Sequence, residues 1–397
     1  MGVGRRVTVA VIAWVAVAAV LRVGVVPPER CPAVTVADAE TAVAEAVGWF
    51  ERNQRDDGTW LYRYDAAADA DLGGYNTVRH AGVTMSLYQA AEIDVAGAEA
   101  VADRGTDYAL ANLVRHDDWA AFEPSSRRVT TGATALLVAG LAHRRAATGD
   151  PVHDEVMAEL GRFLVAQTEP GGSVLAEWDG QLRTSRPGVY SPFFTGEAYW
   201  ALTLLHREFP DAGWDEPARR IGHYLATERD EAEGYQPDIS DHWAAYGLAV
   251  TTTWPGADPD RPLTDAEAVY AERQSGFAGI QVRWESQRTN DWPNWWLRGR
   301  QTLGAGLGTL GEQLGGLWPV AEADERLDHL VEPLAERAVC VAGMLVDRQV
   351  DADEAAATAD PDRTRGAWFQ FDITQMDDQQ HAMSAVLLAL PILEGRP

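Results

Sequence analysis

The feature that most constrains this chain is a succession of twelve segments with helical apolar periodicity, separated by turns rich in glycine, proline and aspartate. Strand-like alternation is almost absent. A chain of this kind must bury helix against helix, so the sequence predicts an all-α fold. The predicted helices centre on Ala39–Arg52, Thr77–Ala91, Ala98–Leu113, Thr131–Thr148, Val152–Gln167, Thr195–Phe209, Glu216–Glu228, Asp241–Trp254, Asp265–Ser275, Gly299–Leu314, Asp324–Asp347 and Met376–Leu393.

Charge is distributed unevenly among these segments. Odd-numbered members, such as Ala98–Leu113 and Asp324–Asp347, are more charged, whereas even-numbered members are rich in Ala, Gly, Leu and Thr. An amphipathic helix covers a surface, and a helix that is small and apolar nearly all round is buried. Six outer helices paired with six inner helices predict an (α/α)6 toroid over residues 38–397. A superhelical repeat array is the alternative, and the glycine-rich run at 304–311 favours closure because it needs neighbours pressed against its backbone.

Composition excludes several classes of function. A formal net charge of -27 repels a phosphate backbone, so no nucleic-acid partner is expected. All 33 basic residues are arginine, which removes lysine Schiff-base catalysis. Cys31 and Cys340 cannot make a thiolate metal site without outside ligands, although a disulfide between them is possible. Neither a metal nor a cofactor is expected.

The N-terminal segment has the pattern of a targeting sequence. Arg5 and Arg6 precede an apolar run that Arg22 interrupts and that resumes at 23–26. Counting past Arg22, residues 1–26 approach the length of a transmembrane anchor with a cytoplasmic N-terminus. A cleaved signal peptide is the rival interpretation. With residues 27–37 as a linker, the expected protein is either single-pass with an extracytoplasmic domain or secreted.

Polar and aromatic residues recur where the predicted inner helices open. In a closed toroid these openings gather at one rim, so their side chains are expected to converge on one cavity. The catalytic candidates are Glu197, Asp241, Asp377, His381 and His80. The candidates for substrate binding are Tyr75, Asn76, Arg79, Trp60, His242, Trp295, Arg298, Arg300 and Asp378.

Each candidate also has a structural interpretation. Asp241 and Asp377 stand where N-caps and first-turn acids are favoured by free N–H groups and the helix dipole. His80 and His381 lie a turn inside a helix, where histidine is often a hydrogen-bonded core residue. Glu197 lies in an otherwise apolar helix, so its carboxyl group must be neutral or paired. Capping-box pairing is the structural alternative for Glu197.

The first predicted hairpin carries a resemblance to a known motif. Trp49-Phe50-Glu51-Arg52-Asn53-Gln54-Arg55-Asp56-Asp57-Gly58-Thr59-Trp60 resembles the QW repeat of terpenoid cyclases, with an aromatic before a glutamine and a Gly-x-Trp turn. More broadly, residues 38–393 resemble the α/α toroids that include six-hairpin glycosidases, sugar epimerases and terpenoid cyclases. The Asp-x-Asp-Asp acid of protonation-initiated cyclases is incomplete, because Gln375-Met376-Asp377-Asp378 lacks the first Asp.

These observations predict a carbohydrate-active enzyme that hydrolyses a glycan, or epimerises a sugar, with paired acid and base residues. Glu197 with Asp241 or Asp377 fits the two carboxyl groups that glycoside hydrolysis needs. The histidines His80, His242 and His381 fit epimerisation, which needs one acid and one base. Two alternatives stay open: a terpenoid-cyclase-like toroid acting on a lipid, and a noncatalytic envelope scaffold that binds a glycan or a protein.

Overall fold

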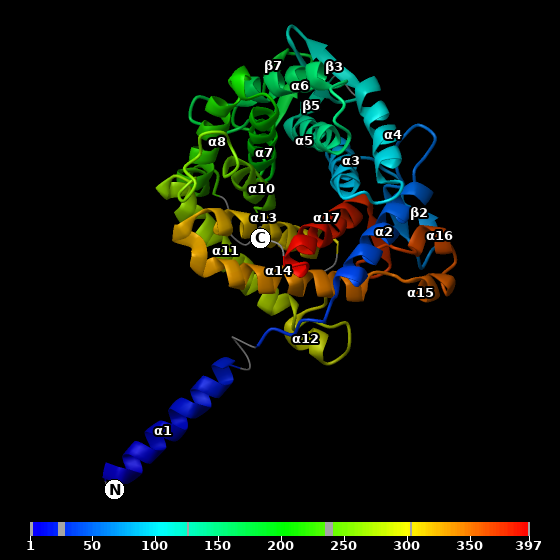
Figure 1. Cartoon of the computed structure of the whole chain (residues 1–397). Coiled ribbons are helices and arrows are strands. Elements are labelled where there is room, and N and C mark those ends of the chain that lie inside the picture. The colour runs from blue at the N-terminus through cyan, green and yellow to red at the C-terminus, as the bar shows by residue number, and fades with distance from the viewer. Residues whose placement is uncertain (1–2, 23–27, 125–126, 235–240, 302–303, 396–397) are drawn as a thin grey trace.

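Two concentric rings of helices form the body of the protein in the computed structural model, which describes residues 3–22, 28–124, 127–234, 241–301 and 304–395 (Figure 1). The inner ring consists of α3 (Thr77–Glu92), α5 (Thr131–Thr148), α7 (Phe194–Glu208), α10 (His242–Thr251), α13 (Ala305–Ala323) and α17 (Met376–Leu393). The outer ring consists of α2 (Val36–Arg52), α4 (Ala98–Ala111), α6 (Asp154–Gln167), α8 (Asp215–Thr227), α11 (Asp265–Glu285) and α14 (Asp328–Arg348).

The inner ring is closed. Each inner helix packs on the next one along the chain, and α17 packs back on α3. On the outside, the last outer helix, α14, contacts the first, α2. The closure confirms the α/α toroid and excludes an open superhelical array, in which the last helix would not meet the first.

Burial explains why small residues dominate the inner helices. In α5 every residue from Thr131 to Ala142 is buried, whereas α2 buries only one face. In α13, a Cβ on Gly308 would lie 2.4 Å from the backbone carbon of His381, and one on Gly315 would lie 2.6 Å from the Cβ of Leu388. The glycines therefore let α13 and α17 approach closely, as the glycine-rich run at 304–311 predicted.

Three helix boundaries differ clearly from the prediction. α11 continues to Glu285, past the predicted end at Ser275, and α13 runs from Ala305 to Ala323 rather than from Gly299 to Leu314. Gly276 and Gly279 resemble helix stops in the sequence, but Gly279 lies under the guanidinium of Arg337 and stays helical. Short helices fill the connections: α9 (Arg229–Ala232), α12 (Asn294–Arg298), α15 (Ala352–Ala356), α16 (Pro361–Thr364), η2 (Pro210–Ala212) and η3 (Glu325–Leu327).

Short strands, which the sequence pattern does not predict, occupy several connections. One sheet has the order β2-β1-β8, a second pairs β3 with β4, and a third has the order β5-β6-β7. Their bounds are β1 (Arg63–Asp65), β2 (Ala70–Asp71), β3 (Leu113–His116), β4 (Trp119–Phe122), β5 (Arg128–Thr130), β6 (Glu177–Asp179), β7 (Thr184–Ser185) and β8 (Ile373–Gln375). Tyr64 of β1 pairs with Thr374 of β8, so this sheet joins the first hairpin to the last. Strands of two to four residues are too short for an alternating pattern to stand out.

The N-terminal helix corrects the prediction of a transmembrane anchor. α1 (Val3–Val20) has 18 residues, including Arg5 and Arg6. At about 1.5 Å per residue it spans about 27 Å, short of the hydrocarbon core of about 30 Å. Among the described residues, no helix combines the length and apolar character that crossing a membrane requires. The single-pass localisation is therefore wrong; the second part of the expected span, 23–26, lies outside the described residues.

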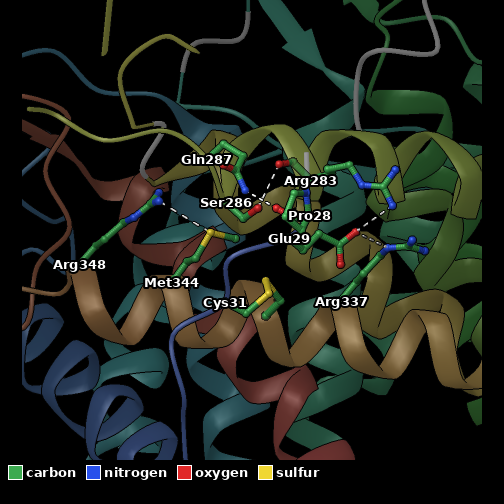
Figure 2. Close-up of a disulfide and its surroundings, with 10 residues drawn as sticks. Pro28, Glu29, Cys31, Arg283, Ser286, Gln287, Arg337, Met344 and Arg348 are labelled. Carbon is green, nitrogen blue, oxygen red and sulfur yellow. Dashed lines mark hydrogen bonds and ion pairs between the residues drawn. A yellow bond between two sulfur atoms is a disulfide. The ribbon is translucent and has the colours of Figure 1, made fainter. Parts of the chain in front are cut away.

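The segment that precedes α2 is fixed to the outer ring. Figure 2 shows the disulfide between Cys31 and Cys340 of α14, with the residues that surround it. The carboxylate of Glu29 forms ion pairs with Arg283 of α11 at 3.6 Å and with Arg337 of α14 at 3.3 Å. The predicted linker is thus held against two outer helices by one covalent bond and two ion pairs.

Removing this disulfide is expected to destabilise the fold. The bond joins residues 309 positions apart, so it restricts a long stretch of the unfolded chain. The double variant Cys31→Ser/Cys340→Ser should lose about 2–4 kcal/mol of unfolding free energy. Urea unfolding measures the loss, and a reductant should destabilise the parent but leave the double variant unchanged. Equal unfolding midpoints for the two proteins would contradict the expected role of the bond.

Candidate active site

The openings of the inner helices surround one cavity of about 560 Å3. All six inner helices contribute to its lining, and α11 adds Gln281. Six of the sequence candidates lie on its wall: Asn76, Arg79, Glu197, His242, Asp377 and His381. Trp243, Phe193 and Phe194 add aromatic surface. The cavity therefore combines two imidazoles, two carboxyl groups and a guanidinium with aromatic walls.

The two histidines of the cavity flank a glutamate that is not among the sequence candidates. Glu312 of α13 is fully buried, and its Oε2 lies 2.6 Å from Nδ1 of His381 and 3.8 Å from Nε2 of His242. The two imidazole rings are nearly perpendicular, with centroids 5.1 Å apart. Residues from three inner helices, α10, α13 and α17, thus meet in one buried cluster.

Hydrogen bonds hold the other oxygen of Glu312. The Tyr246 hydroxyl donates to Oε1 at 3.1 Å, and Nε2 of Gln380 donates to the same atom at 3.3 Å. Burial raises the pKa of Glu312, and His381 opposes that rise. Burial lowers the pKa of His381, but the Glu312 carboxylate, together with the charges of Asp377 and Asp378, more than offsets this effect, so the pKa of His381 is raised. A hydrogen bond of 2.6 Å therefore joins two groups whose pKa values are both raised.

An ion pair lies beside this cluster. Nε of Arg79 is 3.0 Å from Oδ2 of Asp377, and Nη1 of Arg79 donates to the Tyr62 hydroxyl at 2.5 Å and to Oε1 of Gln375 at 3.1 Å. Asn76 is the N-cap of α3, where its side-chain oxygen accepts from the backbone N–H of Arg79 at 3.1 Å. The guanidinium is therefore held in place at the cavity wall by three side chains.

Glu197 faces the same cavity from α7. Its side chain is buried, and Oε2 has no hydrogen-bond partner among the described residues. Burial raises the pKa of Glu197 to about 8, so the neutral acid prevails at pH 7. Gly132 permits this arrangement, because a Cβ there would lie 2.3 Å from Oε2. A neutral carboxyl group in a cavity can donate a hydrogen bond or a proton.

The raised pKa of Glu197 predicts a pH dependence of stability. The unfolded chain ionises this group above about 4.5, whereas the folded protein holds the proton to about pH 8. The neutral carboxyl group therefore contributes its full stabilisation below pH 4.5. Between pH 4.5 and about pH 8 this contribution falls by about 1.4 kcal/mol per pH unit. Urea unfolding at several pH values should show that Glu197→Gln, which cannot ionise, lacks this part of the slope. Parallel profiles for the variant and the parent would contradict the expectation.

Three sequence candidates form a separate cluster around His80 of α3, in which His80 and Trp60 are buried and Tyr75 is half-buried. Nδ1 of His80 lies 2.6 Å from the Tyr75 hydroxyl, and Nε2 lies 2.8 Å from the backbone oxygen of Gly105. The Trp60 ring packs against the imidazole, with centroids 4.9 Å apart. Burial lowers the pKa of His80 to about 4. His80, Tyr75 and Trp60 are not among the cavity-lining residues, and their contacts are those of a packed core.

Asp241 also lies away from the cavity wall. Although it is the N-cap of α10, its side chain does not cap that helix. Instead it forms a buried ion pair with Arg229 and accepts a hydrogen bond from the Tyr270 hydroxyl. The carboxylate therefore joins α10 to α9 and α11.

Asp378 has a capping role. Its Oδ2 accepts from the backbone N–H of Gln375 at 3.1 Å, and its Oδ1 accepts from that of Ala305 at 3.0 Å. Burial, followed by the nearby charge of Asp377, raises the pKa of Asp378 to about 6. Asp378 thus ties the start of α17 to the start of α13, and both helices line the cavity.

The last three candidates belong to the connection between α11 and α13. Trp295 and Arg298 lie on α12, and Arg300 follows it. The guanidinium of Arg300 lies over the rings of Trp295 and Phe371, 4.8 Å and 5.0 Å from their centroids. None of the three lines the cavity.

One group of side chains in the described part of the chain has the composition of a metal-binding set. His242, Glu312 and His381 each offer a ligand atom, and these atoms lie within 4.8 Å of one another. Glu312 itself could be recognised in the sequence only as a lone acid in the apolar stretch of α13, the same signal that selected Glu197.

Comparisons with solved structures agree with the observed architecture. The chain is similar to cellobiose 2-epimerase from Spirochaeta thermophila, with 13% identity, a TM-score of 0.64, and coverage of 91% of this chain and 98% of that one. It is also similar to an α-1,6-mannanase from Salegentibacter, with 12% identity, a TM-score of 0.61, and coverage of 90% and 99%. A type II terpene cyclase from Scytonema aligns with 10% identity, a TM-score of 0.52, and coverage of 90% and 98%.

Sequence comparisons add no assignment. No family model matches the chain, and no curated protein matches it either. The structural similarity, at 13% identity or less for these three proteins, shows the fold. This protein has the α/α-toroid fold that sugar epimerases, mannanases and terpene cyclases share.

Proposed function

We propose that this protein is a sugar epimerase or isomerase that moves a proton at the carbon beside an aldose carbonyl. The observation that carries the proposal is the pair of histidines, His242 and His381, that line one cavity on either side of Glu312. A reaction of this kind needs one base and one acid within reach of the same carbon. Proteins of the same fold include a sugar epimerase and a D-mannose isomerase, which supports the choice of substrate class.

In the proposed reaction, His242 removes the proton from the carbon next to the carbonyl. The electron pair of the broken C–H bond forms the carbon–carbon double bond of an enediol, and the carbonyl oxygen takes up the negative charge or a proton. His381, which is hydrogen-bonded to Glu312, acts as the acid and delivers a proton to carbon. Delivery to the opposite face of the same carbon gives the epimer, as the enediol oxygen forms the carbonyl again and gives up any proton it gained. Delivery to the former carbonyl carbon gives the ketose, as the neighbouring hydroxyl loses its proton and becomes the new carbonyl. His242 then releases its proton to water, and His381 regains one from water. In the reverse direction the two histidines exchange roles.

Other groups on the wall suit the same chemistry. The guanidinium of Arg79, held by Asp377, can stabilise negative charge on the enediol oxygen. Glu197, neutral at pH 7, can donate a hydrogen bond to a sugar hydroxyl. Trp243 offers an apolar face to the C–H surface of a sugar ring.

Glycan hydrolysis is the second candidate, because two carboxyl groups also line the cavity. Glu197 has the raised pKa of a general acid, and Asp377 stands on a different inner helix. Hydrolysis needs one protonated and one ionised carboxyl group across the scissile bond. The histidine pair has no role in that reaction, and the ion pair with Arg79 already engages Asp377. We therefore rank hydrolysis second.

The polar residues of the cavity argue against the alternative of a lipid substrate. A terpenoid-cyclase-like pocket would be almost wholly aliphatic and aromatic, whereas this cavity contains Arg79, Asp377 and two histidines. An ion pair on the wall would be costly to cover with a hydrocarbon substrate. The cavity therefore favours a hydroxyl-rich substrate over a terpenoid.

The experiment that separates the candidates is a substrate screen with paired variants. The parent protein, Glu197→Gln and His242→Asn are incubated with free aldoses, disaccharides and neutral glycans. The products are separated by chromatography. New epimers or ketoses that vanish with His242→Asn support the proposal. New reducing ends that vanish with Glu197→Gln and persist with His242→Asn would replace it with hydrolysis.

A further inference from the structure

The cluster of His242, Glu312 and His381 combines two imidazoles with a carboxylate, the ligand set of many catalytic zinc sites. We propose that this cluster binds one divalent transition-metal ion of the zinc type, and that the bound ion blocks the proton transfer. The second half of the proposal rests on the proposed function, whereas the first half stands on the geometry alone.

The distances within the cluster are near those of a metal site. Ligand atoms at about 2.0–2.1 Å from a tetrahedral ion lie about 3.3 Å from one another. Here Oε2 of Glu312 is 2.6 Å from Nδ1 of His381 and 3.8 Å from Nε2 of His242, and no pair of ligand atoms is more than 4.8 Å apart. Metal binding would lengthen the distance between Glu312 and His381 and shorten the other distances between ligand atoms. Small rotations of the two imidazole rings can produce these changes.

The surroundings of the cluster also suit a metal ion. Oε1 of Glu312 is held by Tyr246 and Gln380, and these contacts leave Oε2 directed at the two imidazoles. Such outer contacts fix the orientation of a ligating carboxylate. His242 and His381 both reach the cavity wall, so the cavity supplies an entrance and an open fourth position.

A bound ion would remove the groups that proton transfer needs. A histidine that donates the lone pair of one ring nitrogen to a metal carries its proton on the other nitrogen, so it can no longer act as a base. The Glu312 oxygen that is hydrogen-bonded to His381 would be occupied as well. The same three side chains can therefore serve proton transfer or hold a metal, but not both at once.

Calorimetric titration of the chelator-treated full chain with zinc chloride tests the site. The parent is expected to bind one ion per chain, and Glu312→Gln and His381→Asn should each weaken binding at least about tenfold. Two control variants remove similar groups that lie outside the cavity: His329→Asn on the exposed face of α14 and Glu322→Gln near the end of α13. Circular dichroism confirms that each variant is folded. No binding by the parent, or equal binding by the ligand variants, would overturn the proposal.

A second readout separates this proposal from the proposed function. Zinc should inhibit the epimerisation of an identified sugar, and a chelator should restore the rate. A rate that rises with zinc would overturn the inhibitory role. If the protein epimerises no sugar at all, the proposed function fails, but the titration with its ligand and control variants still decides whether the metal site exists.

Discussion

Replacing His381 with asparagine is expected to lower kcat by about 10²–10⁴-fold, the usual contribution of a general acid or base. His381 is the member of the pair whose Nδ1 is hydrogen-bonded to Glu312, and it lines the cavity. Asparagine can form hydrogen bonds but cannot exchange a proton near neutral pH. His242→Asn should have an effect of the same order, and steady-state kinetics with the sugar identified by the screen measures both.

The control for these variants is His329→Asn, because that imidazole lies on the exposed surface of α14. Its kcat and KM should match those of the parent. A cavity-histidine variant that raises KM while kcat stays unchanged would point to substrate binding alone. Full turnover by folded His381→Asn would contradict the proposed role.

Asp241→Asn is expected to lower the free energy of unfolding by about 3–5 kcal/mol, as in other buried ion pairs that lose one partner. Arg229 is fully buried, and the Asp241 carboxylate forms its ion pair from 12 residues further along the chain. Asparagine keeps the shape of the side chain but removes the negative charge. Urea unfolding of the parent and the variant measures the difference.

An exposed pair supplies the matched control. Asp215 and Arg219 lie 3.9 Å apart on the surface of α8, so Asp215→Asn should change stability by less than about 1 kcal/mol. The expected role of Asp241 is structural. A variant at Asp241 with unchanged stability and greatly reduced turnover would show instead that this carboxylate takes part in the chemistry.

The helices were predictable from the sequence because burial imposes a strong pattern on them. The predicted bounds of α5 and α17 coincide with the observed ones. Both helices are buried on most sides, so runs of small and apolar residues mark their full length. The strands were not predictable, because each is too short to show a period, and two of the pairings, β1 with β8 and β5 with β6, join segments far apart in the chain.

The position of the cavity was predictable from the openings of the inner helices, but its chemistry was only partly so. Glu197, Asp377 and His381 lie in or near the first turn of a helix, the place at which polar residues recur in the sequence. Glu312 lies two turns inside α13, and nothing in the pattern of α13 shows that it faces His381. That contact depends on how closely α13 and α17 pack.

The structural roles of the other candidates depend on contacts with residues from elsewhere in the chain. The sequence predicts that Asp241 caps a helix, but its carboxylate forms an ion pair with Arg229 on the separate short helix α9. Trp295 was expected to open an inner helix, but α13 begins at Ala305, and Trp295 belongs to the preceding α12. A sequence pattern gives residue types at local spacings, whereas these assignments depend on contacts across loops.

The most direct test of the central claim is the incorporation of solvent deuterium into the sugar. The parent protein is incubated in D2O with the aldose that it converts, and nuclear magnetic resonance follows the signal of the hydrogen next to the carbonyl. Proton transfer through His242 and His381 predicts that this hydrogen is replaced by deuterium as product forms, and that His242→Asn and His381→Asn abolish the exchange. A product that forms with no deuterium on carbon, or cleavage of a glycan without exchange, would contradict the account.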